Sequence, residues 1–259
     1  MRVHIENLSD VDRYIANHKN VKLEDRRLDF ERWLARAKRF ISITPETKIM
    51  EVGTGIGWFP LLCCLNKISC RGIEISPQLV AYGKEFGRRY GVETDIELGN
   101  IEEKDIGQEL YDAIVAWSLF EHVEYWQKGL KNIYQALKSG GVFFFCSTNK
   151  LSLKSGEYNF PFYGWLPNRV RYRLRMARQG ADIMKLGIDF NQFSYPRLRR
   201  EFRRLGYSRI LDRIDLLHIE SMRYYVPWKA NYLKLCRRLT LLKHSALTFM
   251  AGTEFVCIK

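Results

Sequence analysis

The stretch "KIMEVGTGIGWFPLL", residues 48 to 62, constrains the fold of this chain more than any other feature. Gly53, Gly55 and Gly57 stand at alternate positions directly after an apolar run that carries one acid, Glu51. Glycine loses more backbone entropy on folding than any other residue, so this density indicates a turn in which side chains are excluded. The pattern predicts a buried strand, a tight turn and a helix, with a ligand or another segment lying close to the turn.

The same alternation of short apolar runs and helical segments continues along the chain. We expect strands at 48–53, 69–75, 94–98, 112–117 and 142–147, and helices at 57–67, 77–90 and 124–138, with "SGG" at 139–141 as a helix stop. Strands that alternate with helices form βαβ units. The sequence therefore predicts an α/β fold with a mostly parallel sheet covered by helices on both faces.

Four parts of the chain differ in pattern. Residues 1–44 are expected to form a helical N-terminal cap, with Leu28, Phe30 and Trp33 on one face of a helix, and 45–150 the cofactor-binding core. Residues 151–195 are aromatic, broken by proline and then densely basic, which indicates an inserted cover segment. Residues 196–259 are expected to return to the core and to carry a basic helical insertion at 221–247. Ser194, just before this part, is expected to cap a helix that ends before Gly206.

The composition of the chain limits the classes of protein to which it can belong. A chain of 259 residues with 46% hydrophobic and 27% charged residues is a globular protein, for which we expect one large domain. It lacks an apolar run of membrane-spanning length or a signal-peptide start, which predicts a cytoplasmic protein. Its six cysteines show no zinc-ligand spacing, so no metal site is expected. The formal charge of +13 favours an anionic partner: a phosphorylated substrate, nucleic acid or the inner face of a membrane.

Two classes of cofactor use a glycine turn in this place. A dinucleotide site needs a third glycine or alanine so that the helix can pack closely and face a pyrophosphate. Counted from Gly53, that position holds Trp58. The sequence therefore argues against NAD or a related dinucleotide.

The motif Glu-x-Gly-x-Gly-x-Gly, followed by Glu74 in "GIEIS", resembles motifs I and II of the class I S-adenosylmethionine (SAM)-dependent methyltransferases. "YDAIVAWSLFEHV" and "LKSGGVFFFCSTN" are similar to the fourth strand and the fifth-strand entry of the ubiquinone-biosynthesis O-methyltransferase type. The resemblance covers residues 45–150. It implies a Rossmann-like seven-stranded sheet, SAM as cofactor and S-adenosylhomocysteine (SAH) as product.

The resemblance also implies a set of cofactor-binding residues. Glu51 would favour the ammonium group of SAM and Glu74 its two ribose hydroxyls, while Asn100 stands where the family usually has Asp. Glu51 could instead cap the turn, Glu74 could be a solvated acid, and Trp117 could be core packing. The full predicted set is Glu51, Gly53, Thr54, Gly55, Gly57, Glu74, Ile75, Asn100, Ile101 and Trp117.

Methyl transfer needs an aligned acceptor, a dry site and, for a hydroxyl acceptor, a base. His122 is the natural base, although a histidine at a helix entry is more often structural. Related quinone methyltransferases carry an acid where this chain has Ser118, so a metal-assisted catechol mechanism is not expected. The acceptor pocket is predicted at Ser118, Phe160, Phe162, Tyr163 and Trp165, where the aromatic run could alternatively be a plug.

The predicted function is methyl transfer to a small-molecule or a lipid- or carrier-linked acceptor, at oxygen rather than nitrogen. The alternatives are a non-catalytic SAM-binding protein or a nucleic-acid methyltransferase, for which "WSLFEHV" lacks the Asn/Asp-Pro-Pro-aromatic element. Basic residues at 169–178 and 229–243 could contact anionic lipid headgroups, or could be solvated or paired internally.

Overall fold

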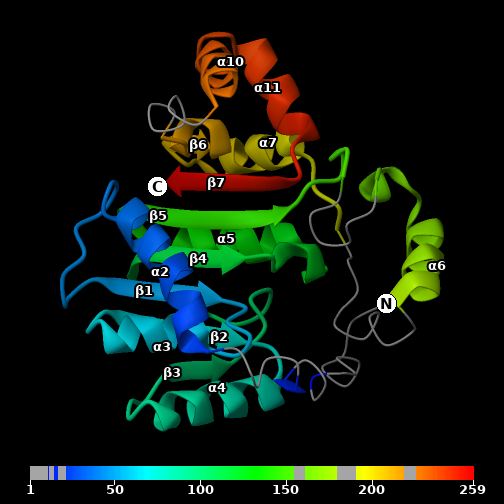
Figure 1. Ribbon diagram of the computed structural model, residues 1–259. Helices are drawn as coiled ribbons and strands as arrows, with labels where there is room; N and C mark the ends of the chain where they lie inside the picture. The colour runs from blue at the N-terminus through cyan, green and yellow to red at the C-terminus, as the bar shows by residue number, and fades with distance from the viewer. Residues whose placement is uncertain (1–10, 12–14, 17–21, 155–160, 180–190, 219–225) are drawn as a thin grey trace.

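The computed structural model describes residues 11, 15–16, 22–154, 161–179, 191–218 and 226–259. Its centre is a seven-stranded sheet in the order β3-β2-β1-β4-β5-β7-β6 (Figure 1). Strands β1 to β5 run parallel, and β7 runs antiparallel to both of its neighbours. The strands are β1 Lys48–Val52, β2 Ser69–Glu74, β3 Asp95–Leu98, β4 Tyr111–Trp117, β5 Leu137–Thr148, β6 Arg209–Asp212 and β7 Gly252–Ile258.

Helices cover both faces of this sheet, as the alternating pattern predicts. One face packs against α2 (Leu23–Ala37), α3 (Trp58–Leu65) and α4 (Pro77–Arg89). The other face packs against α5 Trp126–Ala136, α7 Tyr195–Leu205, α10 Pro227–Arg238 and α11 Thr240–Phe249. The other α-helices in the described part of the chain are α6 Asn168–Gln179 and α8 Arg213–Leu216. Together they make the class I Rossmann-like fold expected from the sequence.

The two cores follow from the two-residue period of the strands. In β5, Phe143 and Phe145 point into the core under α5 and α7, whereas Phe144 between them points into the core under α2 and α3. A strand buried on both faces reads as a continuous apolar run. This explains why "VFFFC" has no polar alternation.

Local signals set several boundaries. The Ser76 side chain accepts the Leu79 N–H at the start of α4, and Pro77 occupies the first turn. Gly206 ends α7 with a φ of 99°, a left-handed conformation that suits glycine. Ser194 is the residue before α7, but its side chain makes no capping hydrogen bond, so the expected cap is wrong in this detail.

Three expectations about helices need correction. Helix α5 ends at Ala136 and β5 begins at Leu137, so "SGG" at 139–141 lies within the β5 segment rather than ending the helix. Leu28 is exposed on α2, whereas Phe30 and Trp33 are buried. The basic helical insertion is two helices, α10 and α11, because Leu239 adopts an extended conformation between them.

Candidate functional site

The predicted site residues lie at the carboxyl ends of neighbouring strands. The order β3-β2-β1-β4 places Asn100, Glu74, the glycine turn and Ser118 successively along one edge of the sheet. The arrows of β1, β4 and β5 point toward this edge, and α6 stands beyond it (Figure 1). Ligands of open α/β sheets bind at this edge. The fold therefore gathers residues that are far apart in the sequence.

The glycine turn is held by its own backbone and by Glu74. Gly53, Gly55 and Gly57 have φ values of 72°, 55° and 78°. The N–H groups of Gly53 and Thr54 donate to the Ile73 carbonyl, and that of Gly55 donates to Glu74 Oε2 at 2.8 Å. These donors are therefore not available to cradle a pyrophosphate, which agrees with the exclusion of a dinucleotide.

Two of the three glycines, Gly53 and Gly57, lie close to other parts of the protein. A Cβ on Gly53 would lie 2.5 Å from Leu119 Cδ1, so the segment after β4 rests directly against the turn. A Cβ on Gly57 would lie 3.1 Å from the Cα of Gly83, where α4 passes α3. The sequence interpretation assigned all three glycines to the ligand. At Gly57 the neighbour is the backbone of Gly83, so a close approach of the protein itself favours glycine, whereas at Gly53 the neighbour is a flexible leucine side chain and the φ of 72° favours glycine.

Glu51 is a buried acid beneath the turn. It is 2% exposed, and its Oε2 accepts a hydrogen bond of 2.5 Å from the Thr54 hydroxyl. Burial raises the pKa of Glu51 well above its ordinary range, the Thr54 bond lowers it, and the nearby Glu74 raises it further. A buried carboxylate held in this way is unfavourable for folding and becomes favourable when a cation such as an ammonium group lies beside it.

We expect Glu51→Gln to stabilise the ligand-free protein and to weaken binding of an ammonium-bearing ligand. Because the folded pKa of Glu51 is raised, its contribution to stability is present at acidic pH and is lost as pH rises through the folded pKa. The difference in melting temperature between variant and parent should therefore grow from pH 4 to pH 8, by a few degrees. Calorimetry at a series of pH values checks this. A difference in melting temperature that stayed constant over this pH range would mean that the pKa of Glu51 is not raised in the folded protein.

Glu74 ends β2 and is almost fully buried. Its Oε2 accepts the Gly55 N–H, and its Oε1 accepts the N–H groups of Ile75 and Ser76 at 2.9 and 3.1 Å. Burial raises the pKa of Glu74, and the three backbone donors oppose that shift. Three of about four lone-pair sites on the carboxylate are therefore used. Its alternative interpretation as a solvated strand-end acid is wrong, because the side chain is 6% exposed.

Asn100 and Ile101 follow β3 beside Glu74. The Gly99 N–H donates to the Glu74 carbonyl at 2.9 Å, which joins the two strand ends. Asn100 Oδ1 accepts the Glu102 N–H at 2.9 Å, so this amide oxygen already stabilises its own turn. Ile101 is buried in the core near Phe120. Their roles at an adenine ring remain predictions.

The end of β4 has an unusual backbone. Ser118 is exposed and has a φ of 45°, a left-handed conformation that is uncommon for a residue with a side chain. Trp117 is half-buried, and its Nε1 is buried without a hydrogen-bond partner among the described residues. Backbone strain, as at Ser118, and a buried donor without a partner, as at Trp117 Nε1, are both often found at binding sites. Both features occur where the reactive end of the ligand is expected.

His122 ends the short helix η2, Phe120–His122, and is half-buried. The residue before it, Glu121, is 1% exposed, and its Oε2 accepts a 2.7 Å hydrogen bond from the Ser147 hydroxyl of β5. The Glu121 carbonyl accepts the Asn191 N–H at 3.1 Å. Glu121 thus ties η2 to the sheet and to the returning chain, which holds His122 in place.

The aromatic run divides into an exposed part and a buried part. Phe162 and Trp165 are exposed and lie 5.5 Å apart between ring centroids, and Trp165 also lies 6.4 Å from Phe249 at the end of α11. Tyr163 is buried, with Arg171 of α6 stacked 5.5 Å from its ring. Tyr163 therefore fits the plug interpretation better than an open pocket. Phe160 lies outside the described residues.

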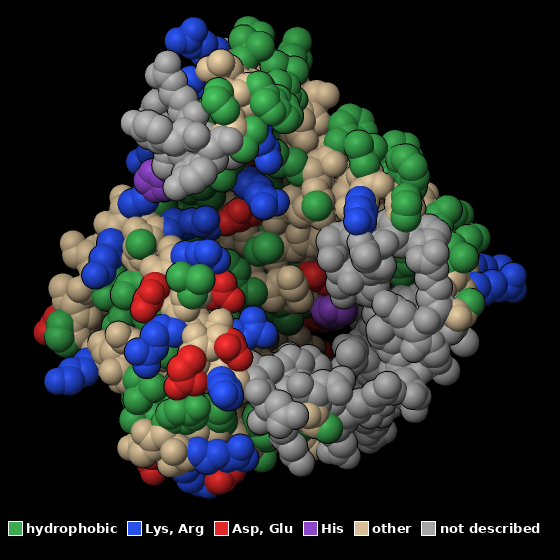
Figure 2. All heavy atoms as spheres, viewed as in Figure 1, with side chains coloured by type: hydrophobic (Ala, Val, Ile, Leu, Met, Phe, Trp, Pro, Cys, Tyr) green, Lys and Arg blue, Asp and Glu red, His purple; other side chains and the backbone are tan. Residues whose placement is uncertain are grey.

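The segment that carries this aromatic run, between Lys150 and Phe193, leaves the sheet and returns to it at neighbouring positions. The Lys150 N–H donates to the Phe193 carbonyl at 2.6 Å, so the two ends of the segment are neighbours. Asn191 Nδ2 donates to the Val123 carbonyl at 2.5 Å, which fixes the returning end to the chain after η2. The face of the molecule shown in Figure 2 is hollowed near its centre. The base of the predicted cover thus lies beside η2.

Sequence reasoning missed Leu119, Glu121 and Phe249 as parts of the site. Glu121 stands next to His122, but nothing in the sequence shows that it is buried and paired with Ser147. Phe249 is far along the chain from Trp165, and only the tertiary fold brings the two rings together. An alignment of related chains would be the signal that finds such pairs.

Comparison with known proteins gives a family and a fold. A family model described as "Methyltransferase domain" matches residues 23–223. A ubiquinone biosynthesis O-methyltransferase of Coxiella burnetii is 23% identical over 164 residues, which are 63% of this chain and 64% of that protein. A ubiquinone/menaquinone biosynthesis C-methyltransferase of Geotalea daltonii is 28% identical over 142 residues, 52% of this chain and 60% of that protein. The matches thus span less than two thirds of either relative.

Solved structures share the fold at low identity. A SAM-dependent methyltransferase from Archaeoglobus fulgidus superposes with a TM-score of 0.57 at 13% identity, covering 95% of this chain and 99% of that one. A phosphoethanolamine N-methyltransferase of Haemonchus contortus, solved with SAM, superposes with a TM-score of 0.55 at 15% identity, covering 87% and 51%. At these identities the comparison concerns the fold alone.

Proposed function

Because the chain belongs to the methyltransferase-domain family and has the class I fold of SAM-dependent methyltransferases, we propose that it transfers a methyl group from SAM to an acceptor oxygen. We propose a small-molecule or a lipid- or carrier-linked acceptor. The observation that carries the proposal is the glycine turn, in which the N–H groups of Gly53, Thr54 and Gly55 have partners within the protein and which is flanked by the buried acids Glu51 and Glu74. This donor pattern suits a ligand that carries an ammonium group and a ribose and lacks phosphates.

The residues at the sheet edge fit SAM in the order of its parts. Asn100 follows β3, Glu74 ends β2, and Glu51 lies in β1 before the turn. We propose that they face the adenine, the ribose and the amino acid end of SAM, respectively. Glu74 Oε2 has room for one ribose hydroxyl while it holds the Gly55 N–H. A second hydroxyl would have to replace that backbone hydrogen bond. We therefore propose that ribose binding and the position of Gly55 are coupled.

When bound, SAM supplies a methyl group on a sulfonium, a leaving group that is already activated. The protein aligns the acceptor, excludes water and accepts the proton of a hydroxyl acceptor. We propose His122 as that base, because Glu121 fixes η2 to β5 through Ser147. Burial raises the pKa of Cys146 to about 12, so this thiol on β5 stays protonated at neutral pH and is not a competing base.

The acceptor site is proposed between the end of β4 and the segment pinned by Lys150 and Phe193. Ser118 is exposed on the β4 side, and Phe162 and Trp165 are exposed on the segment. Aromatic rings that are exposed in the ligand-free protein suit an apolar or ring-shaped acceptor. The names of the quinone-biosynthesis relatives support an acceptor of that class.

A two-stage experiment tests the proposal. Native mass spectrometry of the purified protein should detect bound SAM or SAH, and a methyl-transfer screen over phenols, quinones, sugars and lipids should identify the acceptor. With that acceptor, Trp165→Ala should lower kcat/KM by roughly tenfold, the effect of losing one well-placed aromatic contact. Trp165→Phe, which keeps a ring beside Phe249, is the matched control and should retain most of the activity.

The outcomes separate the alternatives. SAM binding without transfer to any acceptor in the screen would favour a non-catalytic SAM-binding protein. Transfer to RNA or DNA would overturn the small-molecule assignment. Unchanged turnover in Trp165→Ala would remove the aromatic segment from the acceptor site and leave the cofactor assignment intact.

A further inference from the structure

Helix α10 carries two apolar stripes on opposite sides. Ala230, Leu233 and Cys236 recur three residues apart, are buried and belong to the core on the α5 and α7 face of the sheet. A helix at the surface of a globular protein normally has one such stripe and a polar opposite face. The opposite face of α10 is apolar as well.

The outward stripe consists of four residues at spacings of four, three and four: Trp228, Tyr232, Leu235 and Leu239. At about 100° per residue, Trp228, Tyr232 and Leu235 fall within roughly 60° of one another around α10. Leu239 follows directly after the last residue of the helix. All four are exposed, and Trp228 is exposed over 72% of its surface. Leu241, just past the bend at Leu239, is exposed over 87%. We call these five residues the outer stripe.

Figure 2 shows hydrophobic side chains gathered at the end of the molecule formed by α10 and α11. Apolar residues scattered singly over a surface need no explanation, but a contiguous group marks a site of interaction.

Positive charge borders the outer stripe. Residues 227–249 contain no Asp or Glu and five Lys or Arg residues. Lys229 is exposed on one side of the stripe, and Arg238 is exposed on the other. Protein–protein interfaces are depleted in lysine, whereas helices that lie on a bilayer combine Trp and Leu with Lys and Arg.

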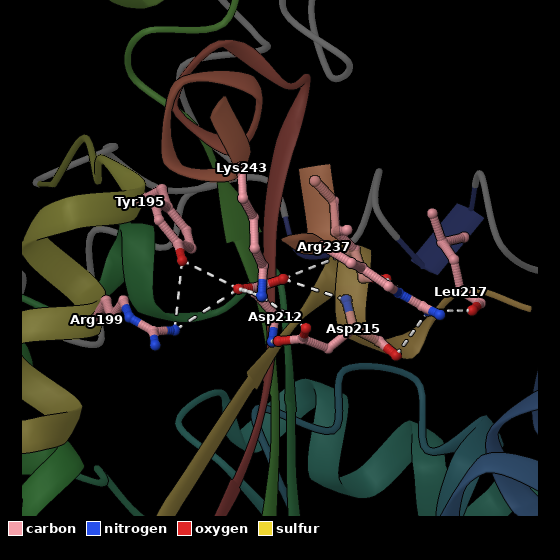
Figure 3. A network of polar contacts seen from close by, with 8 residues as sticks. Tyr195, Arg199, Asp212, Asp215, Leu217, Arg237 and Lys243 are labelled. Carbon is pink, nitrogen blue, oxygen red and sulfur yellow. Dashed lines mark hydrogen bonds and ion pairs between the residues drawn. The ribbon is translucent and has the colours of Figure 1, made fainter. Parts of the chain in front are cut away.

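Lys243 and Arg237 contact other elements of the protein (Figure 3). Lys243 Nζ lies 2.8 Å from the buried Asp212 and 2.6 Å from Asp215. Arg237 donates to the carbonyls of Ile214, Asp215 and Leu217. For these two residues the alternative of internal contacts applies, rather than contact with lipid headgroups. Their contacts attach α10 and α11 to α8 and β6, so the outer stripe is presented by an anchored pair of helices.

We propose that the outer stripe of α10 and α11 docks on an anionic lipid bilayer, with Lys229 and Arg238 against the headgroups. The aromatic and leucine side chains enter the interfacial region, and the helices lie in its plane. Within the described ranges, no helix has the length and apolar character needed to cross a bilayer. Contact with the surface is the mode that these helices offer. This proposal does not depend on the methyl-transfer proposal.

Cosedimentation with vesicles tests the docking. The protein should bind vesicles of equal parts phosphatidylcholine and phosphatidylglycerol at low salt, bind less as salt is raised, and bind pure phosphatidylcholine weakly. The variant Trp228→Ser/Leu241→Ser should lower binding about tenfold or more, as should Lys229→Glu/Arg238→Glu. Quenching of Trp228 fluorescence by brominated lipid, lost in Trp228→Phe, would place that ring in the bilayer.

Matched controls lie elsewhere on the surface. Leu28→Ser/Leu65→Ser removes two exposed leucines of α2 and α3, and Lys84→Glu reverses an exposed charge on α4. These variants should bind vesicles like the parent, and circular dichroism should show all variants folded. No binding at low salt, or equal losses in the controls, would overturn the proposal. So would a dimer in solution that Trp228→Ser/Leu241→Ser dissociates, because the stripe would then face a second copy.

Discussion

Gly55→Val is expected to abolish binding of SAM and SAH, with a loss of affinity of at least about 100-fold. Gly55 has a φ of 55°, which a β-branched side chain strongly disfavours, and its N–H bonds to Glu74. Valine would place two methyl groups where the ligand passes and would displace the turn from Glu74. Isothermal titration calorimetry with SAH measures the change directly.

The control for this variant is Gly91→Val. Gly91 has a φ of 73° in the loop between α4 and β3, and a Cβ there would meet nothing within 4 Å. Both variants impose a similar backbone strain, so both should lower the melting temperature. Only Gly55→Val should lose the ligand. If both retained SAH affinity, the glycine turn would not be the cofactor site.

Glu74→Ala is expected to weaken SAM binding by about 1.5–3 kcal/mol, the range for hydrogen bonds to a charged group. The reason is the loss of the acceptor for a ribose hydroxyl, together with the loss of the bond that positions Gly55. The affinity for SAH should fall by roughly 10- to 150-fold in calorimetry. Undiminished affinity would show that the carboxylate only supports the turn.

A ligand comparison separates the two roles of Glu74. An SAH analogue without ribose hydroxyls should lose little further affinity in Glu74→Ala if ribose recognition dominates. If the variant loses as much for the analogue as for SAH, the effect comes from displacement of Gly55. Thermal unfolding should show a parallel loss of stability, since Ile75 and Ser76 also lose their acceptor.

The sequence predicted the strands of the sheet well because they depend on local patterns. The apolar run before Gly53 and the acid at Glu74 are readable from neighbouring residues, and β1 and β2 each end one residue before the predicted end. The alternation of strand and helix fixes the neighbours β1 and β2 through a right-handed crossover.

The sequence could not predict features that arise from distant contacts. The bend at Leu239 has no glycine or proline, and α10 and α11 are instead held separately by Arg237 and Lys243. Lys243 reads as a surface cation, yet it neutralises Asp212, which has no exposed surface. The contact of Leu119 with Gly53 likewise depends on the β1–β4 pairing.

The hydrogen bond between Lys150 and Phe193 joins the two ends of the segment that lies between them. The two residues are adjacent in space, so the segment between them leaves the core and rejoins it at the same place. Closing a loop of different length across the same two points changes the free energy only slowly with length. With the acceptor site proposed above, we expect that replacing the segment between Lys150 and Phe193 would change substrate preference, while β1 to β4, their register and the glycine turn would stay as they are.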